Sequence, residues 1–375
     1  MREYIVLCTE HYNPLGIIRT LGENGIHPVV IITKERPRYV YKSKYVKKTF
    51  FVNDAEEGIQ IVIHNYSNLN EKSFIFTGDD KTVHALDAHY DELKDHFFFT
   101  NCGKAGVIGH YMDKSNARAL AEECGINCPK TYYVNKGEIP EDITYPIMTK
   151  AINSFGQEWK SVVHICNNEQ ELKRAFTEIE AQQLILQQYI KKNNEVDFEG
   201  VSADDGNDII ICCETYQKYQ LEDKYSPYFD IKNLDPADKP LVNKIQHFLQ
   251  NMRYNGIFEA EFMVDDEGEF WFLEINYRNT AWGYATTVAG NPQVMIWIES
   301  VLNGNKIPDN IYNTVPNGMT AMAECWDYDV RVKSGKISHK QWMKEYRKVN
   351  AKLYKGEKDF RPFMAFMLYK LTHRV

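Results

Sequence analysis

Residues 258–278, which read FEAEFMVDDEGEFWFLEINYR, decide the fold of this chain. Apolar residues flank the turn signal DDEG on both sides, so the pattern predicts two antiparallel strands joined as a hairpin. Glu274 and Asn276 are two positions apart and therefore leave the same face of the second strand. Glu261 lies on the partner strand, where hairpin pairing can bring it beside them.

Two carboxylates and an amide on one patch form a set of hard oxygen donors. Mg²⁺ accepts such a set when water and phosphate oxygens complete its coordination shell. A solvated sheet face with alternating polar residues is the competing interpretation, because many hairpins have one polar face. The hairpin by itself leaves both interpretations open.

Two upstream lysines stand where a phosphate can be bound. Lys114 follows Asp113 at a predicted helix start, and Lys150 closes the strand that begins at Pro146. The polar loop 153–158 then offers backbone N–H groups that can cradle phosphate oxygens. Each lysine taken alone reads as an ordinary surface charge.

A third segment, residues 184–190 with the sequence LILQQYI, is an apolar strand that runs into a polar loop. A strand end of this kind can present backbone groups to an adenine ring, and Glu195 can then accept from ribose hydroxyls. The alternative is simply a strand followed by a polar loop.

The rest of the chain alternates strand and helix patterns. Strands are predicted at 4–8, 27–33 and 73–77, with helices at 15–24 and 81–93, which together indicate a parallel sheet covered by helices. No GxGxxG follows the first strand, so a dinucleotide-dependent oxidoreductase is disfavoured. Further along, the sequence predicts helices at 116–124 and 168–181, strands at 147–152, 161–166 and 184–189, a turn at 204–207 and a helical last fifty residues.

Composition limits the functional classes. The 375 residues carry a net charge of −8, which argues against nonspecific binding to nucleic acid or to an anionic membrane. The eight cysteines never occur with CxxC spacing, as expected of reduced thiols. We find neither a signal peptide nor an apolar stretch of about 20 residues, so we expect a soluble cytoplasmic protein.

The order and spacing of these signals resemble the ATP-grasp superfamily over about residues 1–310, most specifically from Asp113 to Arg278. That pattern has Asp-Lys before a helix that ends in Gly-Ile-x-x-Pro, which matches 113–114 and 125–129 here. A strand with a phosphate-binding lysine, a flexible loop, an adenine-contacting strand and a ribose-binding acid follow. An acid on one strand, Glu-x-Asn on the next and an arginine complete the pattern.

The resemblance implies an α/β protein with the ATP-grasp fold. Residues 1–112 would form a Rossmann-like domain, 113–191 a lid subdomain, 192–325 an antiparallel-sheet catalytic subdomain and 326–375 a C-terminal helical extension. Two features depart from the family pattern. The loop after Lys150 has a single glycine, and Gln187 with Gln188 stands where an acid is common.

The resemblance also implies roles for individual residues. Glu261, Glu274 and Asn276 would hold one or two Mg²⁺ ions, or Mn²⁺, and Arg278 would stabilise the transferred phosphoryl group and the developing oxyanion. ATP would be bound by eight further residues, namely Lys114, Lys150, Ser154, Gly156, Gln188, Tyr189, Ile190 and Glu195.

The activity implied is that of an ATP-dependent carboxylate–amine ligase that forms an acyl phosphate and releases ADP and phosphate. The stretch Phe76–Asp80 and the long first domain resemble the D-aspartate ligase and carbamoyl-phosphate-synthase-like branch. The expected partners are a small carboxylate and a small amine, with a homodimer as the candidate assembly and neither nucleic acid nor membrane. A carboxyphosphate-using carboxylase and an ATP-binding module without turnover remain alternatives. Trp282 and Tyr284 either line a substrate pocket or pack in the core.

Overall fold

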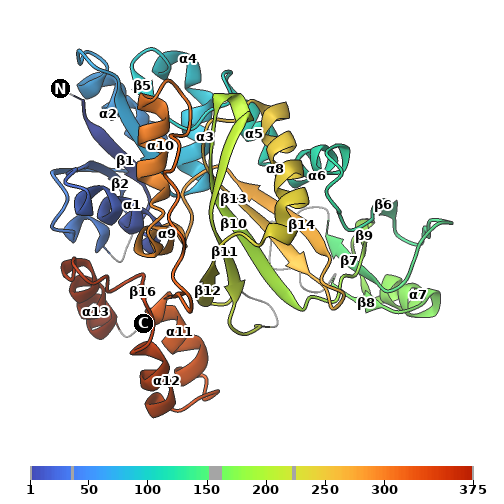
Figure 1. The fold of residues 1–375 in the computed structure, drawn as a ribbon. Coiled ribbons are helices and arrows are strands. Elements are labelled where there is room, and N and C mark those ends of the chain that lie inside the picture. The colour runs from blue at the N-terminus through green and yellow to red at the C-terminus, as the bar shows by residue number, and fades with distance from the viewer. Residues whose placement is uncertain (1, 35–37, 152–162, 222–224, 374–375) are drawn as a thin grey trace. The chain divides into compact units, whose positions relative to one another are not determined.

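A computed structural model describes residues 2–34, 38–151, 163–221 and 225–373 (Figure 1). The contacts divide the chain into two compact units. The larger unit comprises residues 1–126, 194–261 and 274–375, and the smaller unit comprises 127–193 and 262–273. Each unit is described separately below.

The larger unit begins with a five-stranded sheet in the order β3-β2-β1-β4-β5, in which every adjacent pair is parallel. The strands β1 and β4 have the bounds that the sequence predicts. The five strands are β1 (Tyr4–Cys8), β2 (Val29–Thr33), β3 (Lys48–Val52), β4 (Ser73–Thr77) and β5 (Phe97–Phe98). The predicted Rossmann-like sheet is therefore confirmed.

Helices cover both faces of this sheet, which explains why β1 and β2 are continuous apolar runs. Ile5 and Leu7 pack with Ile59 and Val62 of α2 on one face. The intervening positions of β1 pack with α1 and α10 on the other face. The helices of this region are α1 (Tyr12–Glu23), α2 (Ala55–Tyr66), α3 (Asp80–Ala88), α4 (Tyr90–Leu93), α5 (Val107–Tyr111) and α6 (Lys114–Glu123).

The second sheet has seven strands in the order β14-β13-β10-β11-β12-β15-β16. The tip of its β13–β14 hairpin, residues 262–273, belongs to the smaller unit. The strands are β10 (Asn194–Ala203), β11 (Asp208–Gln217), β12 (Tyr228–Lys232), β13 (Gly256–Val264), β14 (Phe270–Asn276), β15 (Thr320–Met322) and β16 (Ala351–Lys352). Three helices accompany it, namely α8 (Lys239–Met252), α9 (Gly283–Ala289) and α10 (Gln293–Leu302).

The smaller unit contains a four-stranded antiparallel sheet in the order β6-β9-β7-β8. Leu172 and Phe176 of α7 pack on Leu184 and Leu186 of β9 to form its core. Its elements are β6 (Thr131–Asn135), β7 (Ile147–Ala151), β8 (Ile165–Cys166), α7 (Glu169–Glu178) and β9 (Gln183–Gln188). The predicted strand 161–166 starts among residues outside the described part of the chain.

The C-terminal segment, predicted to be helical, also contains a two-residue strand, β16. β16 pairs in parallel with β15, so the last segment supplies an edge strand, and the seven-stranded sheet is not wholly antiparallel. The helical elements around it are α11 (Glu324–Tyr328), a π-helical turn (Asp329–Lys333), α12 (His339–Tyr346) and α13 (Arg361–His373). The two-residue strand lies in a lysine-rich segment without the apolar alternation that would identify it.

A buried arginine fastens this segment to the first helix. Arg19 of α1 is fully buried, and its Nη1 donates to the carbonyl of Leu353 at 2.7 Å. Its Nη2 donates to the carbonyls of Tyr354 and Asp359 at 2.8 and 3.0 Å, and its Nε lies 3.6 Å from the Asp359 carboxylate. None of the helices among the described residues is long and apolar enough to cross a bilayer.

Candidate active site

The seven-stranded sheet of the larger unit carries acidic residues at alternate positions on neighbouring strands. β10 contributes Glu195, Asp197 and Glu199, and β13 contributes Glu259 and Glu261. All five are buried, with exposed fractions of 8% or less. Alternation along a strand sends such side chains to one face, and strand pairing brings the sets together.

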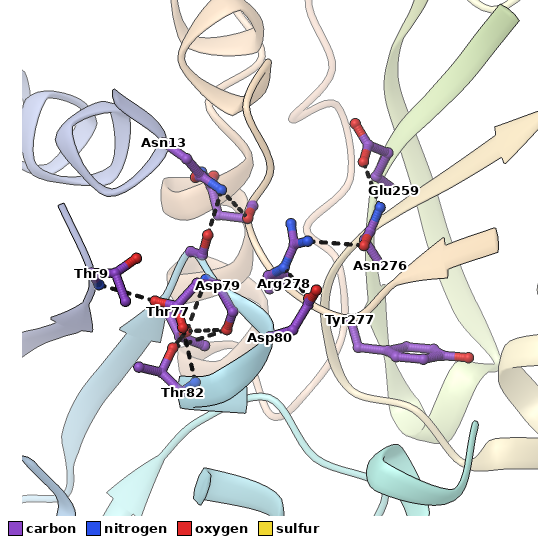
Figure 2. A network of polar contacts seen from close by, with 12 residues as sticks. Thr9, Asn13, Thr77, Asp79, Asp80, Thr82, Glu259, Asn276, Tyr277 and Arg278 are labelled. Atoms are coloured by element: carbon purple, nitrogen blue, oxygen red, sulfur yellow. Dashed lines mark hydrogen bonds and ion pairs between the residues drawn. The ribbon is translucent and has the colours of Figure 1, made fainter. Parts of the chain in front are cut away.

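Asn276 on β14 links the predicted metal residues. Its Nδ2 donates to Glu261 Oε1 at 2.6 Å and to Glu259 Oε2 at 2.9 Å. Its Oδ1 accepts from Arg278 Nη2 at 3.0 Å (Figure 2). The structure therefore brings Glu261, Asn276 and Arg278 into one hydrogen-bonded group.

Glu274, two positions before Asn276, forms an ion pair with Lys114. The Nζ of Lys114 lies 2.7 Å from Glu274 Oε2. Desolvation alone would lower the pKa of Lys114, but the Glu274 carboxylate raises it above its ordinary value. Asp113 positions this lysine, because its carboxylate caps α6 by accepting from the backbone N–H groups of Ser115 and Asn116.

Arg278 also contacts the start of helix α3, which follows β4 in the same unit. Its Nε donates to Asp80 Oδ1 at 2.6 Å, while its own side chain is 15% exposed (Figure 2). Asp79 holds this region by capping α3, where its Oδ1 accepts from the Thr82 N–H and its Oδ2 from the Thr9 N–H, both at 3.0 Å. Asp80 thus begins a helix at the carboxyl end of β4, next to β1.

Asn13 ties the same loops together from α1. Its Nδ2 donates to the carbonyl of Gly78 at 2.7 Å and to the carbonyl of Asn279 at 2.8 Å (Figure 2). Gly78 precedes Asp79 and Asp80, and Asn279 follows Arg278. A single buried amide therefore fixes the two segments whose side chains form the Arg278–Asp80 pair.

Crowding of carboxylates shifts their protonation. Burial raises the pKa of Glu261 well above its ordinary range, and the negative charges of Glu259 and Glu274 add to this. Burial likewise raises the pKa of Glu199 to about 7. Burial and the negative charge of Glu261 raise the pKa of Asp197 as well. A cation placed among these groups would restore their charged forms.

The donor set fits Mg²⁺. Asn276 presents Nδ2 to the carboxylates, and half a turn of its amide would present Oδ1 instead, giving two carboxylates and an amide oxygen from Glu261, Glu274 and Asn276. No cluster of three or more His, Cys, Asp or Glu side chains in metal-binding geometry occurs in the ranges that the structure describes. An ion held here would therefore need phosphate or water oxygens to complete its shell, as Mg²⁺ commonly has.

The nucleotide residues implied by the resemblance fall in both units. In the larger unit, Glu195 is buried on β10 and accepts a short hydrogen bond from Gln217 Nε2, so its carboxylate contacts β11. In the smaller unit, Lys150 Nζ on β7 donates to Gln187 Oε1 of β9 at 2.6 Å. Gln187 was not among the predicted site residues, although its side chain holds the lysine.

Gln188, Tyr189 and Ile190 follow β9. The Gln188 N–H donates to the Lys130 carbonyl at 2.7 Å, and the Tyr189 N–H donates to the Pro146 carbonyl at 2.9 Å. These bonds fix the backbone of the strand end next to β6 and β7. Ser154 and Gly156 lie outside the described residues.

Sequence reasoning missed Asp197, Glu199 and Glu259. A signal was present, since residues 195–199 read EVDFE, with acids at every second position of an apolar strand. Hydrogen bonds satisfy part of the cluster: Thr215 Oγ1 donates to Asp197 at 2.7 Å, and Thr280 Oγ1 donates to Glu199 at 2.8 Å. Their burial next to Glu261 makes these acids further members of the candidate site.

The two interpretations of Trp282 and Tyr284 are now distinguished. Trp282 is 2% exposed and packs on Phe229 with ring centroids 4.0 Å apart. Tyr284 is 5% exposed and donates its hydroxyl to Glu23 Oε1 at 2.7 Å. Both are packing residues of the core, and the substrate-pocket interpretation of these two side chains is wrong.

Comparisons with known proteins agree with this geometry. Residues 113–298 match the family model "Carbamoyl-phosphate synthase L chain, ATP binding domain". The mitochondrial pyruvate carboxylase of Homo sapiens is 22% identical over 289 residues, which cover 70% of this chain and 24% of that protein. The chain thus spans about a quarter of the length of this curated relative.

Two solved structures share the fold. One is the biotin carboxylase domain of Hydrogenobacter thermophilus 2-oxoglutarate carboxylase in complex with MgADP, ADP and bicarbonate, with a TM-score of 0.61, 18% identity and coverage of 85% of this chain and 73% of that one. The other is the L-amino acid ligase from Bacillus licheniformis, with a TM-score of 0.57, 13% identity and coverage of 80% and 74%. The chain has the ATP-grasp fold, and its residues 113–298 are similar to the ATP-binding domain that this family model describes.

Proposed function

We propose that this protein is an ATP-dependent carboxylate–amine ligase. The observation that carries the proposal is the group formed by Glu261, Glu274, Asn276 and Arg278, in which cation-binding oxygens lie beside an arginine. Such a pairing suits a reaction in which negative charge moves between phosphate and an acyl group.

Each residue has a proposed task. Glu261, Glu274 and Asn276 would hold magnesium, which when bound neutralises charge on the terminal phosphates of ATP. Lys114 and Lys150 would contact phosphate oxygens, so Lys114 would leave Glu274 as nucleotide binds. Arg278 would bind the transferred phosphoryl group and the oxyanion that forms when the amine attacks the acyl phosphate.

The surroundings of Arg278 favour an amine as the second substrate. Asp80 accepts from Arg278 Nε at 2.6 Å, so one carboxylate contacts the arginine directly. The exposed Asp80 carboxylate can accept a hydrogen bond from the ammonium group of an amine substrate. Short amino acids are therefore the amines to examine first, and D-aspartate is among the first acids because of the branch resemblance.

A carboxylase that phosphorylates bicarbonate is the second candidate. The relatives favour it, because the curated sequence matches include a pyruvate carboxylase and one structural neighbour contains bicarbonate. The same magnesium and phosphate residues would serve both reactions. The two candidates differ in which anion stimulates ATP cleavage.

The test is to incubate the protein with MgATP and a panel of amino-acid pairs, or with bicarbonate alone, and to measure ADP and phosphate. Ligase activity predicts ADP release that requires both an acid and an amine, together with transfer of oxygen-18 from the substrate carboxylate into phosphate. ADP release that bicarbonate alone supports would replace the ligase proposal with the carboxylase. AMP as the nucleotide product would contradict both, because metal ions at the β- and γ-phosphates direct attack to the γ-phosphorus.

A further inference from the structure

Helix α13 is apolar around most of its circumference, yet the chain covers only one side of it. Phe366 stacks on Tyr354 with ring centroids 4.9 Å apart and lies 5.0 Å from the ring of Tyr39. Pro362, on the same side of the helix, is buried. A helix that is apolar all round is normally covered on every side, so the remaining side of α13 is unusual.

Three side chains form the uncovered side. Met364, Leu368 and Leu371 are spaced by four and three positions and therefore share one face of the helix, which we term the apolar stripe. Their exposed fractions are 53%, 63% and 76%, the last being the largest among the exposed large apolar residues of the described chain. Single exposed leucines are common, but three aligned on one helix mark a contact surface.

The segment that carries the stripe has the opposite charge to the rest of the chain. Residues 331–375 contain 13 Lys and Arg but only 3 Asp and Glu, whereas the whole chain contains 44 and 52. Residues 331–375 therefore carry a net charge of about +10, although the net charge of the whole chain is −8. The expectation that the protein avoids anionic membranes rests on that whole-chain charge and does not apply to this segment.

Acids neutralise four of these cations: Arg331 pairs with Asp327 and Glu345, Lys333 and Lys370 pair with Asp329, and Lys358 pairs with Glu23. Two of the three acids are already paired, since Glu345 lies 2.7 Å from Arg331 Nη2 and Asp359 contacts Arg19. Lys340, Lys344 and Lys348 are exposed at four-residue intervals along and just beyond α12. Within the described ranges, these three lysines form no ion pair, and residues 360–375 contain no acid.

Charge selects among the possible occupants of the stripe. A second copy packed symmetrically through this surface would oppose two strongly basic segments, which repel each other. A bilayer that contains anionic lipids offers an apolar interior for the stripe and negative headgroups for the lysines. We propose that residues 331–373, with helices α12 and α13 shown in red in Figure 1, form a docking surface for an anionic lipid bilayer.

The proposal is tested by co-sedimentation of the full chain with vesicles. We expect binding to phosphatidylcholine vesicles that contain about 30 mol% phosphatidylserine, and at least tenfold weaker binding to pure phosphatidylcholine. Binding should weaken as the salt concentration rises from about 0.1 to 0.5 M, because screening shortens the reach of the lysine charges.

Two variants separate the apolar and electrostatic contributions. The double variant Leu368→Glu with Leu371→Glu changes side chains that are already exposed, so the fold should survive while vesicle binding falls at least tenfold. The triple variant Lys340→Glu, Lys344→Glu and Lys348→Glu should lose binding to a similar extent. Leu302→Glu is the matched control, since Leu302 is 51% exposed on α10 and should leave binding unchanged.

Several results would overturn the proposal. These are an absence of binding to phosphatidylserine vesicles, equal binding to neutral vesicles, or wild-type binding by either multiple variant. A lipid-free dimer that disappears in the Leu368→Glu, Leu371→Glu variant would assign the stripe to a second copy of the chain and would equally reject the bilayer.

Discussion

Replacement of Arg278 by methionine should reduce catalytic turnover by a factor of about 10² to 10³, with little effect on stability. The structure gives this side chain two polar contacts, Nε to Asp80 at 2.6 Å and Nη2 to Asn276 at 3.0 Å. If those donors act on the oxyanion during the reaction, the loss resembles that of one oxyanion-hole donor, about 2.7–4 kcal/mol. The stability cost should be small because Asp80, the charged partner left behind, is 60% exposed and can be hydrated, while methionine keeps the packing of the aliphatic part of the Arg278 side chain.

Arg278→Lys refines the same prediction. Lysine keeps the positive charge but cannot donate from two nitrogens in a fixed plane, so it should recover only part of the lost rate. The assay is ADP release in the presence of the acid and amine that the substrate panel identifies, with thermal unfolding recorded for each variant.

The chain provides a matched control in Arg253. Its Nε and Nη2 contact Asp205 at 3.1 and 2.5 Å, a similar two-point contact away from the site. Arg253→Met should leave kcat unchanged. If Arg278→Met turned over within about threefold of the wild type while remaining folded, the assigned role of Arg278 in the reaction would be refuted.

Four further outcomes are expected. Lys150→Ala should raise the KM for ATP about ten- to a hundredfold, the worth of one charge-assisted phosphate contact, with little change in unfolding temperature. Glu274→Gln should abolish turnover but keep the fold. In this variant, added magnesium should increase the affinity for ATP less than it does in the wild type. Arg19→Leu should lower the free energy of unfolding by about 3–5 kcal/mol in denaturant titration, because it leaves the Asp359 carboxylate buried without its partner. Burial raises the pKa of Glu214 to about 7, from an ordinary value near 4.5, so between these pH values the folded state binds a proton that the unfolded state has lost. The free energy of unfolding should therefore decrease as the pH rises from about 4.5 to 7. In Glu214→Gln this decrease should be smaller by about 2–3 kcal/mol.

Much of the fold could be predicted because local pattern and tertiary structure agree. β1 and β4 are short apolar runs bounded by polar loops, and each is buried on both faces, so the run marks the strand. The β13–β14 hairpin follows from alternation around the turn at Asp265. Asp113 is also a helix cap, as its place before a helical pattern indicates.

The parts that could not be predicted depend on residues far apart in the chain. Lys114 meets Glu274 across 160 positions, and no local pattern records such a pair. Asp197 and Glu199 were overlooked because an acid on an otherwise apolar strand normally indicates a solvated face, whereas here both acids are fully buried. Their burial depends on the two neighbouring strands, β11 and β13, and on Thr280, which lies 81 positions beyond Glu199.

The contacts between Arg19 and residues 353–359 have a consequence for the order in which the protein folds during its synthesis. The first helix leaves the ribosome about 340 residues before Asp359, which at about 5–20 residues per second is a delay of roughly 20–70 s. Throughout that interval the Arg19 guanidinium has none of the three carbonyl acceptors that it holds in the finished structure. The nascent N-terminal sheet must therefore keep α1 hydrated or loosely docked until residues 353–359 are made and complete its packing.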